Sequence, residues 1–135
     1  MEKSITIHCN KLYVGDPCYV LKGKEYDSIC AGDSMAAVED LGISHRVPGG
    51  DGTIGDETGR CYDIESGQIA VVSGNKADLE LPKNASFWAK VFYDSMTIID
   101  VDTGVAEVTM IEEDGSLTIY VSDGNSRIFD ASFDI

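Results

Sequence analysis

The sequence lacks any long apolar segment. No stretch approaches the roughly 18 to 20 consecutive apolar residues that a membrane-spanning helix needs. The first eight residues, which include Glu2, Lys3 and His8, also lack the apolar core of a signal peptide. We therefore expect a cytoplasmic protein that does not associate with a membrane.

Basic residues are scarce. The 135 residues include 10 Lys and Arg but 24 Asp and Glu, which gives a formal net charge of −14. Direct binding of nucleic acid or of an anionic membrane through a broad basic face is therefore not expected. The imbalance is greatest in residues 94–135, where ten acidic residues accompany one basic residue, Arg127.

Metal-binding sequence motifs are also missing. The four cysteines, Cys9, Cys18, Cys30 and Cys61, are widely spaced and include no Cys-x-x-Cys pair, and the chain has only two histidines. In a reducing compartment such cysteines are free thiols that pack as small apolar side chains. We therefore expect no metal ion and no cofactor.

Only three prolines are present, whereas 14 glycines provide many positions for tight turns. This composition predicts a single domain over residues 1–135 that is mainly β, either all-β or β-rich α+β. The expected architecture is a twisted antiparallel sheet, open or closed into a small barrel or sandwich. One or two short helices are expected around residues 24–41, in residues 25–30 and in residues 35–41, with Asp33 or Ser34 as the cap and Gly42 as the terminator of the second.

The last fifty residues have the clearest strand pattern. β-Branched and aromatic residues are concentrated in five segments separated by Asp, Gly and Asn: residues 87–93, 96–101, 105–111, 117–121 and 127–133. They predict an antiparallel meander. Upstream, residues 60–64 and 68–72 predict a hairpin around residues 65–67. Trp88 is interpreted as a packing residue of the first strand, although an aromatic side chain can also line a ligand pocket.

Two motifs occur in the first half of the chain. One is Gly15-Asp16-Pro17-Cys18-Tyr19-Val20, and the other is Gly50-Asp51-Gly52-Thr53 followed by Asp56, Gly59, Tyr62 and Ser66-Gly67. In this order the motifs resemble those of small, functionally uncharacterised proteins of phages and bacteria, over about residues 12–70. The resemblance implies a β-rich accessory protein of phage or mobile-element type, and it assigns no catalytic residue.

The acidic C-terminal third supports a first functional hypothesis. Carboxylates on a rigid sheet can imitate nucleic-acid phosphates and attract a basic protein. Asp100 and Asp102 are predicted to share one face of a strand. The proposed partner-binding residues are Asp100, Asp102, Glu107, Glu112, Glu113 and Asp114. The hypothesis describes a non-enzymatic binding or accessory protein, such as an inhibitor of a nucleic-acid-binding protein, and the alternative is a solvated face that only keeps the protein soluble.

A second hypothesis is a protein that binds or sequesters a nucleotide-like small molecule. Six of the ten basic residues precede residue 61, so a local basic pocket is compatible with the net charge. Its candidate residues are Tyr13, Asp16, Tyr19, Arg46, Asp51 and Arg60. A third hypothesis, a metal-dependent hydrolase, would use Asp16, Asp51, Asp56 and Asp63. Asp and Gly in turns explain the same residues structurally, so catalysis is the less favoured interpretation.

Overall fold

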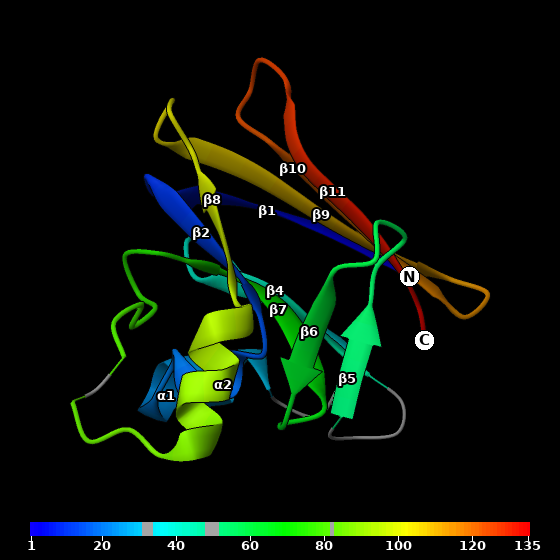
Figure 1. Ribbon diagram of the computed structural model, residues 1–135. Helices are drawn as coiled ribbons and strands as arrows, with labels where there is room; N and C mark the ends of the chain where they lie inside the picture. The colour runs from blue at the N-terminus through cyan, green and yellow to red at the C-terminus, as the bar shows by residue number, and fades with distance from the viewer. Residues whose placement is uncertain (31–33, 48–51, 82) are drawn as a thin grey trace.

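The structure is a computed structural model that describes residues 1–30, 34–47, 52–81 and 83–135 (Figure 1). About half of the chain lies in strands, which confirms the prediction of a mainly β protein. The described strands form a four-stranded sheet, a five-stranded sheet and a two-stranded hairpin. The described helices are α1 (Gly23–Ile29), α2 (Phe87–Ser95) and a 3₁₀ turn at Pro17–Tyr19.

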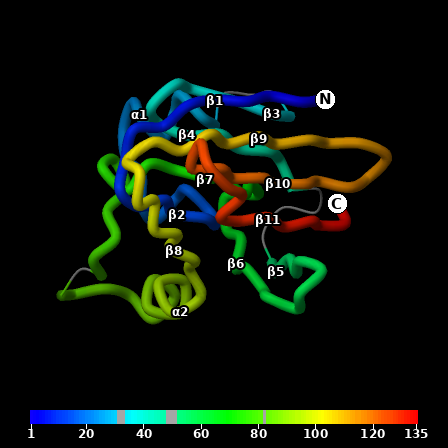
Figure 2. The backbone as a smooth tube through the Cα atoms, turned by 90° about the horizontal axis from the view of Figure 1, so that it is seen from above, coloured from blue at the N-terminus to red at the C-terminus, as the bar shows by residue number. Residues whose placement is uncertain are grey.

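The four-stranded sheet, called sheet A, contains most of the predicted meander. Its strands are β1 (Glu2–His8), β9 (Val105–Glu113), β10 (Ser116–Ser122) and β11 (Arg127–Asp134), all antiparallel and in the order β1-β9-β10-β11. Figure 2 shows these four strands side by side, with α2 lying apart from them. A two-residue turn at Asp114-Gly115, both with positive φ, joins β9 to β10 as Asp-Gly hairpin turns do.

The five-stranded sheet, called sheet B, brings together distant segments. Its strands are β2 (Lys11–Gly15), β3 (Met35–Val38), β4 (Gly42–Arg46), β7 (Gln68–Ser73) and β8 (Thr97–Asp100), in the order β3-β4-β7-β2-β8. The hairpin pairs β5 (Gly52–Gly55) with β6 (Cys61–Ile64). The two large sheets remain separate, so the closed barrel that was one predicted option does not form.

Two apolar cores cover the two faces of sheet B. On β7, Ile69 and Val71 join the core shared with sheet A, whereas Ala70 and Val72 join the core shared with α1 and α2. A strand buried on both faces needs apolar residues at consecutive positions, which explains the unbroken Ile-Ala-Val-Val run of β7. The layers are therefore sheet A, sheet B and the helices, in that order (Figure 1).

One of the two predicted helices is correct. Helix α1 falls within the expected region, but Met35–Val38 is strand β3 and not the start of a second helix. β3 pairs with β4, and its Met35 side chain is buried in the core. Pairing of β3 with β4 therefore outweighs the helical propensity of residues 35–38. The predicted cap Asp33 lies outside the described residues.

The predicted strand at residues 87–93 is wrong, because Phe87–Ser95 forms helix α2. Ser86 caps the helix, with its Oγ accepting a hydrogen bond from the Ala89 amide at 3.2 Å. Phe92 and Tyr93 bury their rings in the core beneath sheet B. Packing of these two rings outweighs the β-propensity of the segment.

The predicted hairpin between residues 60–64 and 68–72 is also wrong. β6 pairs with β5, whereas β7 pairs with β4 and β2. Residues 65–67 therefore connect two different sheets. Their position depends on Asp16, which precedes them by about fifty residues in the chain.

Candidate functional site

Asp16 fixes the loop that connects β6 to β7. Its side chain has no exposed surface, and Oδ2 accepts hydrogen bonds from the Glu65 amide at 2.6 Å and the Ser66 amide at 2.7 Å. Oδ1 accepts from the Cys18 amide at 2.8 Å and from Ser66 Oγ at 2.6 Å. Four donors satisfy the buried carboxylate, which is the condition for burying such a group.

Gly15, directly before Asp16, has no room for a side chain. Tyr13 is fully buried, and its Oη donates to the backbone oxygen of Asp16 at 2.7 Å. A Cβ on Gly15 would lie 2.5 Å from that Oη, and the φ of Gly15 is +152°. The hydrogen bonds between Asp16 and Ser66 hold the Gly15-Asp16-Pro17 and Ser66-Gly67 motifs in contact, although they are about fifty residues apart.

A cleft lies between α2 and the β5–β6 hairpin, and its residue Glu65 is held by the hydrogen bond from its amide to Asp16. The cleft has a volume of about 420 Å³, and its described lining residues are Tyr19, Gly52, Thr53, Asp63, Ile64, Glu65, Trp88, Val91 and Phe92. The Tyr19 and Phe92 rings pack with centroids 4.4 Å apart. Tyr19 Oη donates a hydrogen bond to Glu65 Oε2, which raises the pKa of Tyr19.

The cleft combines apolar rings with carboxylates. Thr53 Oγ1 donates to Asp63 Oδ1 at 3.2 Å, and Glu65 follows two residues later. No Lys or Arg belongs to the described lining. Trp88 is 69% exposed, so the interpretation of this residue as a packed strand residue is wrong. Its neighbour Phe87 is equally exposed, and large exposed aromatic side chains are typical of interaction sites.

Of the six candidates for a nucleotide-like ligand, the five that the structure describes do not converge. Tyr13 and Asp16 have no exposed surface to offer a ligand, and of these five described candidates only Tyr19 lines the cleft. Arg46 ends β4, and Arg60 lies with its Cζ 6.0 Å from the centroid of the Tyr62 ring. Asp51 lies outside the described residues.

The three described candidates for a metal site, Asp16, Asp56 and Asp63, accept hydrogen bonds in turns and strands. Asp56 Oδ1 accepts from the Thr58 amide, Thr58 Oγ1 and the Arg60 amide, at 2.6 to 3.0 Å. Asp16 is saturated by four donors, and Asp63 accepts from Thr53. Within residues 1–30, 34–47, 52–81 and 83–135, no group of three His, Cys, Asp or Glu residues could hold a metal ion. All four cysteines are free, as the sequence predicted.

The six predicted partner-binding acids do not lie together on one face, because Asp100 belongs to β8 of sheet B and the other five lie in or beside β9 of sheet A. Asp100 ends β8 and pairs with Lys11 at 2.8 Å, and Asp102 lies in the following turn, so these two residues do not share a strand. Glu112, Glu113 and Asp114 lie at the other end of β9, in and beside the turn to β10. Only Glu107 and Glu113 belong to the outward row of β9, which alternates with the buried Ala106, Val108 and Met110.

The outward face of sheet A carries further acids that the sequence-based prediction missed. The strand registers and burial patterns place five carboxylates on this face: Glu2, Glu107, Glu113, Asp130 and Asp134. Arg127 is the one guanidinium there, and its Cζ lies 3.9 Å from the centroid of the outward Tyr120 ring. In β11, the acids Asp130 and Asp134 alternate with the apolar Ala131 and Phe133. This period of two could have identified both acids as outward-facing from the sequence.

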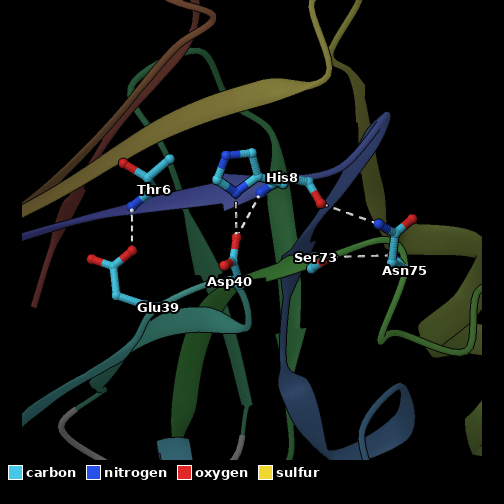
Figure 3. A network of polar contacts seen from close by, with 6 residues as sticks. All are labelled: Thr6, His8, Glu39, Asp40, Ser73 and Asn75. Carbon is cyan, nitrogen blue, oxygen red and sulfur yellow. Dashed lines mark hydrogen bonds and ion pairs between the residues drawn. The ribbon is translucent and has the colours of Figure 1, made fainter.

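Side chains also cover the exposed edge of β1 (Figure 3). The Thr6 amide donates to Glu39 Oε2 at 3.1 Å, and the His8 amide donates to Asp40 Oδ1 at 3.0 Å. His8 Nδ1 lies 2.7 Å from the same Asp40 oxygen, which lowers the pKa of Asp40. These two amides are therefore not available to pair with another strand.

No described helix is long and apolar enough to cross a membrane. No protein-family model matches the chain, and neither a curated protein nor a solved structure is significantly similar to it. The resemblance of residues 12–70 to uncharacterised phage and bacterial proteins therefore stays a prediction.

Proposed function

We propose that this chain is a non-enzymatic binding protein that recognises a basic protein partner through the outward face of sheet A. The observation that supports the proposal is the composition of that face. Its acidic and basic side chains are five carboxylates, one guanidinium and the imidazole of His8, and Arg127 is stacked on the outward Tyr120. Most of the remaining outward residues are Ser or Thr.

The spacing of the carboxylates suits a broad partner surface. Glu107 and Glu113 are six residues apart on β9, which corresponds to about 20 Å along the strand. Asp130 and Asp134 lie two strands away, at about 10 Å across the sheet. Strand pairing fixes the backbone at these positions, so mainly side-chain freedom is lost on binding, and the carboxylates steer a basic partner into contact.

Proteins that bind nucleic acid are one class of partner with a complementary basic surface. Covering such a surface would compete with the nucleic acid, so inhibition is the specific form of this proposal. The resemblance to phage proteins favours the same interpretation. A nucleotide-like ligand is less well supported, because the described lining of the cleft is acidic and the basic candidates do not converge on it.

The experiment compares two variants of equal charge. The face variant carries Glu107→Gln, Glu113→Gln, Asp130→Asn and Asp134→Asn. The control variant carries Glu25→Gln, Glu80→Gln, Asp27→Asn and Asp94→Asn, all at exposed positions outside sheet A. Both variants remove four negative charges, so a general effect of net charge acts equally on them.

Binding is measured by calorimetric titration with a short poly-L-lysine, and in parallel by pull-down from a bacterial lysate with mass spectrometry. We expect the face variant to lose most of the binding and the control variant to retain it, with affinity falling steeply between about 50 mM and about 500 mM salt. Equal losses in the two variants would contradict a role for this face. Circular dichroism establishes that both variants are folded.

A further inference from the structure

The cleft beside α2 shares no residue with the outward face of sheet A and has a different chemistry. We propose that it binds a small organic cation, a guanidinium or primary ammonium group on a short apolar stem. The proposal combines a cavity, a set of aromatic rings and two carboxylates. It is independent of the protein partner proposed above.

The charge of the cleft selects a cation. Asp63 on β6 and Glu65, which directly follows this strand, both line the cleft. Each accepts one described hydrogen bond through a single oxygen, Asp63 Oδ1 from Thr53 and Glu65 Oε2 from Tyr19. Among the described residues no donor contacts the second oxygen of either carboxylate, so this oxygen can accept from a ligand N–H, and such charge-assisted bonds are strong.

The aromatic wall suits the same ligand. Trp88, Tyr19 and Phe92 line the cleft, and the Trp88 side chain is largely exposed. Cations are attracted to the faces of aromatic rings, most strongly to that of Trp. The chain already contains one such contact, since the Arg127 guanidinium stacks on Tyr120. An apolar stem can pack against Val91 and Ile64, which complete the wall.

The size and rigidity of the cleft are also appropriate. Its volume of about 420 Å³ falls within the range of small-molecule sites, roughly 300 to 1,000 Å³. Asp16 fixes the backbone amide of Glu65, and Tyr19 orients the Glu65 carboxylate. Because these contacts exist before any ligand binds, the carboxylate needs little further ordering on binding.

Trp88 provides the assay, because it is the single tryptophan of the chain. Its fluorescence is followed during titration with N-butylguanidinium, with n-butylammonium and with the neutral N-butylurea, which has a similar shape. We expect a saturable change with the two cations and none with the urea. Glu65→Gln keeps an oxygen for Tyr19 but loses the charge, and we expect it to weaken cation binding by about tenfold or more.

The matched control is Glu107→Gln, the same change on the outward face of sheet A, and we expect cation binding to remain unchanged. Asp63→Asn is the second variant of the cleft, used if Glu65→Gln does not fold by circular dichroism. Equal responses to the cations and to the urea, or full affinity in both folded cleft variants, would overturn the proposal. Saturation only by an Arg-containing pentapeptide, with no response to the free cations, would also overturn the assignment to a small molecule.

Discussion

Replacing Asp16 with Asn tests the structural centre of the molecule. The substitution preserves shape and removes the charge from a side chain that accepts four hydrogen bonds at 2.6 to 2.8 Å with no exposure to solvent. Asn has one oxygen, which can serve the Glu65 and Ser66 amides. Its NH₂ group must then face the Cys18 amide, so two donors point at each other and that amide is left without an acceptor.

The magnitude follows from these contacts. A buried donor left without a partner costs about 1 to 3 kcal/mol, and the two bonds to a neutral oxygen are weaker than those to a carboxylate by about 0.5 to 1 kcal/mol each. We therefore expect Asp16→Asn to lower the free energy of unfolding by about 3 kcal/mol. This is a large part of the roughly 5 to 15 kcal/mol that stabilises a typical domain.

The assay is urea unfolding followed by far-UV circular dichroism, with the free energy taken from the midpoint and slope. Asp100→Asn serves as the control, because Asp100 is 72% exposed and its ion pair with Lys11 lies at the surface. We expect that variant to lose less than about 1 kcal/mol. A loss below about 0.5 kcal/mol in Asp16→Asn, the level of an ordinary surface substitution, would refute the assigned role of the carboxylate.

Three further results are expected. Gly15→Ala should lower the free energy of unfolding by about 2 kcal/mol or more in the same assay, because of its φ of +152° and the 2.5 Å contact of the added Cβ with Tyr13 Oη. In an NMR titration, Asp40 should have a pKa below its ordinary value of 3.8, and His8→Ala should raise it. Since this pKa is lowered by folding, the stability it contributes is present above pH 3.8 and is lost as the pH falls through the folded-state pKa. Cys61, the exposed cysteine, should react with a thiol reagent before the other three, as peptide mapping of the labelled protein will establish.

The site depends on contacts that no local pattern contains. Asp16 and Ser66 are fifty residues apart in the chain. Only the tertiary structure brings the Ser66 hydroxyl close enough to donate a hydrogen bond to the Asp16 carboxylate. The cleft likewise depends on helix α2. The residues of α2 have the aromatic and β-branched composition of a strand, so the sequence predicted a strand there. Burial of Phe92 and Tyr93 against sheet B determined the helix, and this left Trp88 exposed at the cleft.

The sequence by itself determined the mainly β character, the acidic surface and the free cysteines. Asp and Gly in the turns, and the alternation of apolar and polar residues in residues 105–134, were enough to predict the β9–β10 and β10–β11 hairpins of sheet A. These interactions are local in the chain. The tertiary structure alone decided which strands join different sheets and which acids share a face. The strand register determines which acids share a face. The register results from packing over the whole sheet and not from spacing along the chain.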